Sequence, residues 1–243
     1  MKSIFAYDSK FMQVLLVVAD YLILNFLFIL CCLPIFTIGA AQAGLYTGIK
    51  VLQDKEDDSS CAKAFFRGFA SGFGTITVGW VLTTVIMVVL GYNLALVLFY
   101  QYAGLYAPEF LATLPLYVGE QAPLVLSCIA VAIIMIFQSV LTIFHASFGC
   151  KLGQLFKNAF LMILAHPLRC LTVTLLTWLP VIILILYPPF FLQASIAWFA
   201  IYYSVAFRIN YKTMQKPFLV ITQNFVEAYE AEHGEILLEE AEK

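Results

Sequence analysis

The feature of this chain that most limits its possible folds is the alternation of long apolar segments with short clusters of basic residues. Of the 243 residues, 63% are hydrophobic and 12% are charged, whereas a soluble domain is about half apolar and a quarter charged. All thirteen Lys and Arg residues can be placed on one side of a membrane, because segments 100–122 and 170–207 contain none. Short cytoplasmic loops of membrane proteins carry such an excess of positive charge. We therefore predict an all-α, multi-pass protein of the cell membrane with both termini in the cytoplasm.

A membrane-spanning helix needs roughly 20 mostly apolar residues, and the chain offers six such segments. They cover residues 12–33, 35–52, 74–100, 122–149, 170–187 and 190–207. The second segment is ambiguous because it contains several glycines, so five spans are possible, with the amino terminus then outside. Within it, Ala40, Gly44 and Gly48 recur at four-residue spacing and predict a small-residue ridge for close helix packing. Pro188 and Pro189 predict a sharp hairpin between the last two spans.

Two shorter segments between the spans combine basic and apolar residues. In segment 61–73, phenylalanines recur at four-residue spacing with Lys63 and Arg67 interleaved, and the segment after residue 150 carries Lys151, Lys157 and Asn158 on one face. The opposite face of the second segment comprises Leu152, Leu155, Phe156, Ala159 and Phe160. Basic amphipathic helices suit the membrane interface, so we expect two cytoplasmic surface helices that either bind lipid headgroups or dock a protein.

The distribution of acidic residues divides the chain into two parts. Glutamates concentrate near the carboxyl end, after the last predicted span and the last basic cluster. We therefore expect a helical membrane domain over residues 1–216 and an acidic cytoplasmic tail over residues 217–243, which is a surface helix or a partly disordered end.

Asp20 is the sharpest candidate for a functional residue. It lies well inside the first predicted span, close to the middle of the bilayer. An ionised carboxylate there costs at least about 2.5–3.5 kcal/mol unless it is paired or hydrated. Two interpretations are open: Asp20 is a proton or substrate site facing a water-filled cavity, or it is a neutral acid that bonds Asn25, Gln42 or a backbone carbonyl.

Further polar residues lie within the predicted spans. Asn25, Asn93 and Gln138 are best explained as groups that form hydrogen bonds between helices. His145 lies near the inner end of the fourth span, where it is either a packing residue or part of a proton relay.

Nothing in the sequence indicates catalysis. Neither a G-x-S-x-G nucleophile motif nor a phosphate-binding glycine loop occurs. His, Cys and acidic residues do not fall at metal-ligand spacing. We therefore expect no enzyme activity, metal, cofactor or nucleic-acid partner, and we expect the lipid bilayer as the main environment.

Several motifs resemble the YesL family of bacterial membrane proteins. They lie at residues 19–25 (Ala-Asp-Tyr-Leu-Ile-Leu-Asn), 33–40, 43–46, 65–67, 155–160 and 166–169. The resemblance extends over roughly residues 10–215. It implies no established activity, but members of the family are often encoded beside carbohydrate ABC importers and their sensor systems in Gram-positive bacteria.

On this basis we expect a non-enzymatic accessory or regulatory subunit of a carbohydrate ABC importer. The contact with the importer is expected through the small-residue ridge, the amphipathic helices, or both. A small-solute transporter or channel with Asp20 in its pathway is one alternative, and a membrane scaffold or sensor partner is another. A continuous polar cavity that reaches Asp20 would favour the transporter.

Overall fold

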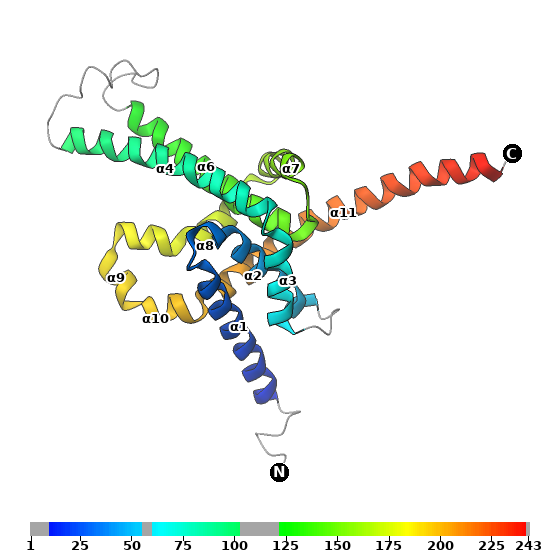
Figure 1. The fold of residues 1–243 in the computed structure, drawn as a ribbon, viewed down its shortest axis with the longest axis horizontal. Coiled ribbons are helices and arrows are strands. Elements are labelled where there is room, and N and C mark those ends of the chain that lie inside the picture. The colour runs from blue at the N-terminus through cyan, green and yellow to red at the C-terminus, as the bar shows by residue number, and fades with distance from the viewer. Residues whose placement is uncertain (1–9, 55–59, 103–121, 242–243) are drawn as a thin grey trace, which may run out of the picture.

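The computed structural model describes residues 10–54, 60–102 and 122–241, and none of these residues is in a strand (Figure 1). Within these ranges, five segments are long and apolar enough to cross a membrane: Phe11–Cys32, Ile35–Asp54, Thr75–Leu96, Val125–Phe148 and Pro167–Leu186. The predicted all-helical, polytopic architecture is confirmed. The elements are α1 (Lys10–Cys32), η1 (Ile35–Thr37), α2 (Ile38–Asp54), α3 (Cys61–Gly72), α4 (Thr75–Tyr102), α6 (Ala122–Phe148), α7 (Leu152–Ala165), α8 (Pro167–Leu186), α9 (Pro188–Gln193), α10 (Ser195–Ala197), the π-helix η2 (Trp198–Tyr202) and α11 (Tyr203–Ala241).

Helix α2, the ambiguous segment of the sequence, lies at the centre of the fold. In its apolar window 61% of the residues are buried, compared with 22–33% in the other four candidate spans. Helices α1, α3, α4, α6 and α11 all pack against it. Small side chains explain this position, because they let several helices approach one backbone closely.

The small-residue ridge of α2 is filled by other helices of the same chain. A Cβ atom added to Gly44 would lie 2.8 Å from the backbone oxygen of Phe65 in α3. One added to Gly48 would lie 2.6 Å from Leu24 in α1, and Ala40 is fully buried. The ridge therefore packs mainly against α3 and also against α1, and it leaves no free face for an importer.

Two pairs of helices extend from this centre. Helices α4 and α6 run side by side, joined by the hydrogen bond from Gln138 Nε2 to Thr84 Oγ1 at 2.8 Å. Helix α8 packs against both α11 and α6, and Trp178 Nε1 donates to Ser139 Oγ in α6 at 3.1 Å. Figure 1 shows that the α4–α6 pair and the segment from α8 to α10 extend from the central helices in different directions.

The predicted sixth span, residues 190–207, is not one helix. It is divided among α9, α10, the π-helix η2 and the start of α11. The adjacent prolines Pro188 and Pro189 begin α9 rather than a sharp hairpin, and Ala194 interrupts the helix with φ −88° and ψ 6°. The return of the chain is therefore a broad turn (Figure 1). Five helices rather than six have the length and composition of spans in the described ranges.

A proline within α8 is compensated by a tyrosine from this broken segment. Pro180 has no N–H to donate to the carbonyl of Leu176, four residues earlier. The hydroxyl of Tyr202 donates to that carbonyl instead, at 2.7 Å. The contact joins η2 to α8 and satisfies a backbone group that would otherwise lack a partner in the membrane.

The last helix crosses the predicted domain boundary without a break. Helix α11 runs from Tyr203 to Ala241 and contains Pro217. The division between a membrane domain (1–216) and a tail (217–243) thus falls within one continuous helix. Figure 1 shows the later part of α11 projecting away from the other helices.

Candidate functional site

Asp20 lies beside the first turn of α3. Its carboxylate accepts a hydrogen bond from the thiol of Cys61, the first residue of that helix, with a sulfur–oxygen distance of 3.4 Å. A negative charge is favoured there, because the first N–H groups of a helix and its dipole attract it. The partner is neither Asn25 nor Gln42, the two side chains expected from the sequence.

The depth of Asp20 also differs from the expectation. The neighbouring Tyr21 accepts a hydrogen bond from Gln53 at 2.9 Å, and Gln53 is the last residue but one of α2. Asp20 is therefore level with the end of α2, not with its middle. The part of α1 before Asp20 extends past α2, so the carboxylate need not be buried in the hydrocarbon core.

Further polar contacts link α1 and α2 to each other and to α11. We call the residues that make these contacts, together with Asp20 and Cys61, the Asp20 network. The hydroxyl of Tyr211 in α11 donates to both carboxylate oxygens of Asp54, at 2.6 and 2.7 Å. The guanidinium of Arg208 lies over the ring of Tyr21, 5.6 Å from its centroid. The network comprises Asp20, Tyr21, Gln53, Asp54, Cys61, Arg208 and Tyr211. Of these residues only Asp20 was a candidate from the sequence, although an acid at the end of an apolar segment, such as Asp54, is a usable signal.

The Cys61 thiol is protonated at neutral pH in this setting. Burial, reinforced by the charge of Asp20 and by the hydrogen bond to it, raises the pKa of Cys61 from 9.0 to about 11. Because the pKa in the folded protein lies above that in the unfolded chain, the contribution of this thiol to stability is complete below pH 9.0. It is lost as the pH rises toward about 11.

We expect alkylation of Cys61 by iodoacetamide to be slow at pH 9.0 and to accelerate toward pH 11, because the thiolate is the reactive species. Asp20→Asn removes the neighbouring charge, so the rise of the alkylation rate with pH should begin at a lower pH. Mass spectrometry of the peptide that contains Cys61 measures both profiles. If the two profiles coincide, the contact between Asp20 and Cys61 does not exist in the membrane.

Asn25 stabilises the irregular segment around η2. Its side chain is fully buried, and its Nδ2 donates to the carbonyl of Phe199 at 2.6 Å. Its Oδ1 accepts from the backbone N–H of Ser204 at 3.1 Å, and the Ser204 hydroxyl donates to the carbonyl of Tyr21 at 2.9 Å. Asn25 thus links helices, as predicted. Its partners are a carbonyl of the π-helix and an N–H of α11, two backbone groups that would bond to each other's neighbours in a regular α-helix.

The other intramembrane candidates have separate surroundings. Gln138 bonds Thr84 across helices, as predicted. Asn93 donates to the carbonyl of Val89 in its own helix, at 2.9 Å, so its predicted role between helices is wrong. His145 is 5% exposed, lies next to Gly72, and has no hydrogen-bond partner for Nδ1 among the described residues. Asp20, Asn25, Asn93, Gln138 and His145 therefore do not form one site.

The basic residues proposed for docking lie on exposed surfaces of α3 and α7. Lys63, Arg67, Lys151 and Lys157 are exposed, and Asn158 is partly exposed. The predicted apolar face of α7 is only partly correct, because Leu155 and Ala159 are buried whereas Phe160 is 57% exposed.

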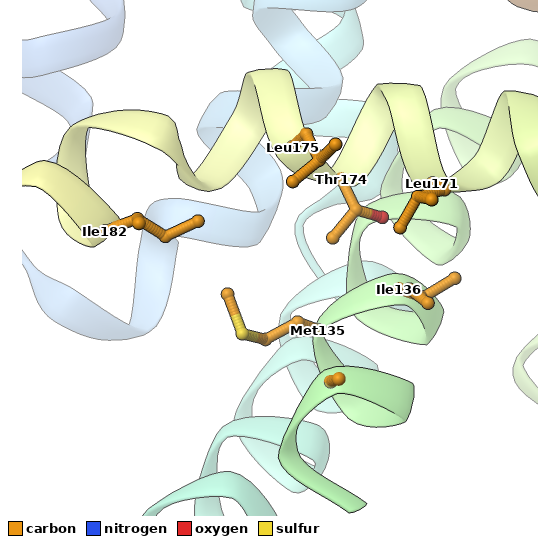
Figure 2. A pocket seen from close by; sticks show the side chains of 7 residues that line it. Met135, Ile136, Leu171, Thr174, Leu175 and Ile182 are labelled. Atoms are coloured by element: carbon orange, nitrogen blue, oxygen red, sulfur yellow. The ribbon is translucent and has the colours of Figure 1, made fainter. Parts of the chain in front are cut away.

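An apolar groove of about 170 Å³ lies between parts of α6 and α8 (Figure 2). The one hydroxyl in its lining, that of Thr174, donates to the carbonyl of Cys170 at 2.8 Å, so the groove offers a ligand no side-chain hydrogen-bond donor. Seven residues line the groove: Ala132, Met135, Ile136, Leu171, Thr174, Leu175 and Ile182.

The described ranges contain no group of three or more His, Cys, Asp or Glu residues able to hold a metal ion.

Comparison with known proteins identifies one segment of the chain. Residues 21–94 match DUF624, a protein family of unknown function. DUF624 is the domain found in YesL-like proteins. The DUF624 segment contains α2, α3, most of α1 and most of α4, and therefore the packed ridge and Asn25. No curated protein and no solved structure matches the chain.

Proposed function

We propose that this chain is a non-enzymatic protein of the cell membrane that acts as an accessory or regulatory subunit of a carbohydrate ABC importer. The class of partner follows from the resemblance to the YesL family. The proposed contact follows from the groove between α6 and α8, which is the observation on which the proposal mainly depends.

The groove suits insertion of side chains from a spanning helix of another protein. Helices α6 and α8 contact each other, α6 also packs against α4 and α8 against α11, and a recess remains between α6 and α8 (Figure 2). Both walls belong to helices with the composition of membrane spans. Association of helices in lipid relies on close packing of complementary surfaces rather than on exclusion of water. A preformed apolar recess is therefore a surface that a membrane partner can recognise.

The polar residues support a structural role rather than a transport pathway. Asp20, on which the transporter alternative depends, is bonded to Cys61 and does not line the groove. Asn25 and Gln138 form hydrogen bonds within the chain. The hydrogen bond between Tyr211 and Asp54, the last residue of α2, holds α11 at the carboxyl-terminal end of α2. This placement supports the proposal that the basic clusters and both termini face the cytoplasm.

Site-specific photocrosslinking in native membranes tests the contact. With p-benzoylphenylalanine at Leu175 or Ile182, we expect covalent adducts with a permease subunit of the importer, identified by mass spectrometry. Val88 on α4, which is 63% exposed and lies outside the groove, is the matched control and should give none. Equal adducts at Val88, or only lipid adducts at both groove positions, would overturn the proposal.

A further inference from the structure

The α8 wall of the groove consists of two parts that lie on either side of Pro180. Leu171, Thr174 and Leu175 precede the proline, and Ile182 follows it. Figure 2 shows Ile182 on a different turn of α8 from Thr174 and Leu175. A proline inside a helix removes one backbone hydrogen bond and clashes with the carbonyl four residues earlier, so it is the point at which α8 can bend. The shape of the groove therefore depends on the angle between the two parts of α8.

Packing against other helices fixes mainly the first part of this wall. Every buried residue of α8 lies at or before Pro180, and none of residues 181–186 is buried. Near the end of the helix, Ile185 and Leu186 are 72% and 76% exposed. The position of Ile182 consequently depends on contacts made at the proline and in the turn that follows α8.

A hydrogen bond from η2 replaces the one that Pro180 cannot make. The hydroxyl of Tyr202 donates to the carbonyl of Leu176 at 2.7 Å. In a regular helix this carbonyl would accept from the N–H of residue 180. Asn25 in α1 holds the same π-helix, because its side chain donates to a backbone carbonyl there at 2.6 Å. The Tyr202 hydroxyl is therefore presented by a segment that is itself attached to another helix.

We propose that the Tyr202–Leu176 hydrogen bond controls the shape of the groove by setting the bend of α8 at Pro180. While the bond is made, the second part of α8 is held and Ile182 stays in the wall. A shift of η2 that withdraws the hydroxyl leaves the Leu176 carbonyl without a partner in an apolar setting, and the second part of α8 then changes its angle. Such a shift would regulate the contact with the importer. This regulatory role rests on the proposed function, whereas the effect on the groove does not.

Distances between spin labels, measured by double electron–electron resonance in lipid nanodiscs, test the effect on the groove. Labels on p-acetylphenylalanine leave the six cysteines untouched. One pair joins Ile133 in α6 to Ile185, after the proline, and the other joins Ile133 to Leu168, before it; all three residues are exposed. Tyr202→Phe removes only the hydroxyl and should broaden the first distance distribution but not the second. Tyr203→Phe, the matched control on the next residue, should leave both unchanged.

Pro180→Ala provides a second, independent variant. Alanine restores an N–H that donates to the Leu176 carbonyl, so the tyrosine hydroxyl is no longer needed there. In the Pro180→Ala background, Tyr202→Phe should therefore leave the Ile133–Ile185 distances unchanged. Equal broadening by Tyr202→Phe in both backgrounds would overturn the proposal, and so would an absence of broadening in the chain that retains Pro180.

Photocrosslinking separates this inference from the proposed function. With p-benzoylphenylalanine at Ile182, Tyr202→Phe should reduce the yield of importer adducts, and the loss should be smaller at Leu175, before the proline. An unchanged yield at Ile182 together with broadened distances would overturn the regulatory role. If the unsubstituted tyrosine chain gives no adducts at either position, the proposed function is contradicted, and the distance measurements still confirm or overturn the control of the groove by Tyr202.

Discussion

Replacing Asn25 with leucine is expected to lower the free energy of unfolding by about 1–3 kcal/mol, because it removes two hydrogen bonds from a fully buried side chain to backbone groups. These groups are the carbonyl of Phe199 and the N–H of Ser204. Both belong to the segment around η2, where regular helical bonding is interrupted. Thermal unfolding in detergent measures the overall loss, and hydrogen exchange at the Ser204 amide measures the local one.

Asn93→Leu is the matched control. Asn93 occupies another apolar helix of the chain, but within the described residues its side chain bonds only the carbonyl of Val89 in its own helix. We expect a change within about 0.5 kcal/mol, as for substitutions that leave no buried group unsatisfied. A similar loss for both variants would mean that Asn25 has no special role in holding η2.

Gly44→Ala is expected to destabilise the protein by about 1–3 kcal/mol, as overpacking of a close contact does. The new Cβ would meet the backbone oxygen of Phe65 at 2.8 Å, and a backbone atom cannot rotate away as a side-chain tip can. Helices α2 and α3 would therefore have to separate. The melting temperature in detergent gives the effect.

Gly91→Ala in α4 provides the comparison for this substitution. Apart from the adjoining residues and backbone of α4 itself, no atom of the described residues lies within 4 Å of the position that the added Cβ would occupy. Alanine favours a helix over glycine by up to about 1 kcal/mol, so this variant should be neutral or slightly more stable. If Gly44→Ala also proves neutral, the close packing of α3 on α2 is wrong.

Apolar length and helix boundaries could be predicted well from the sequence. The segments 12–33, 74–100 and 122–149 agree within a few residues with α1, α4 and α6, because roughly 20 apolar residues suffice to specify a spanning helix. The spacing of Ala40, Gly44 and Gly48 correctly predicted a packing face. It could not identify α3 as the main partner, since spacing along one helix carries no information about which helix approaches it.

Long-range contacts account for most of what could not be predicted. The broken segment before α11 is held by Asn25 and by the Tyr202–Leu176 bond, and both contacts join residues far apart in the sequence. Asn93 and Gln138 are both amides in apolar helices, yet only Gln138 faces a neighbouring helix with a suitable hydroxyl. The level of Asp20 depends on how far α1 extends past α2, which apolar length alone leaves undetermined.

The unbroken course of α11 has a mechanical consequence. Its 39 residues form a rod of about 58 Å at the usual helical rise. One end adjoins the π-helix braced by Asn25, and Tyr211 is attached to Asp54 a short way along. Farther along, the ring of Phe218 lies 5.9 and 5.2 Å from those of Phe144 and Phe148 in α6. A small rotation near η2 would pivot the rod about this packed part and swing its far end through a larger arc. Any rearrangement of the turn formed by α9 and α10 would thus reach the carboxyl terminus as an amplified displacement.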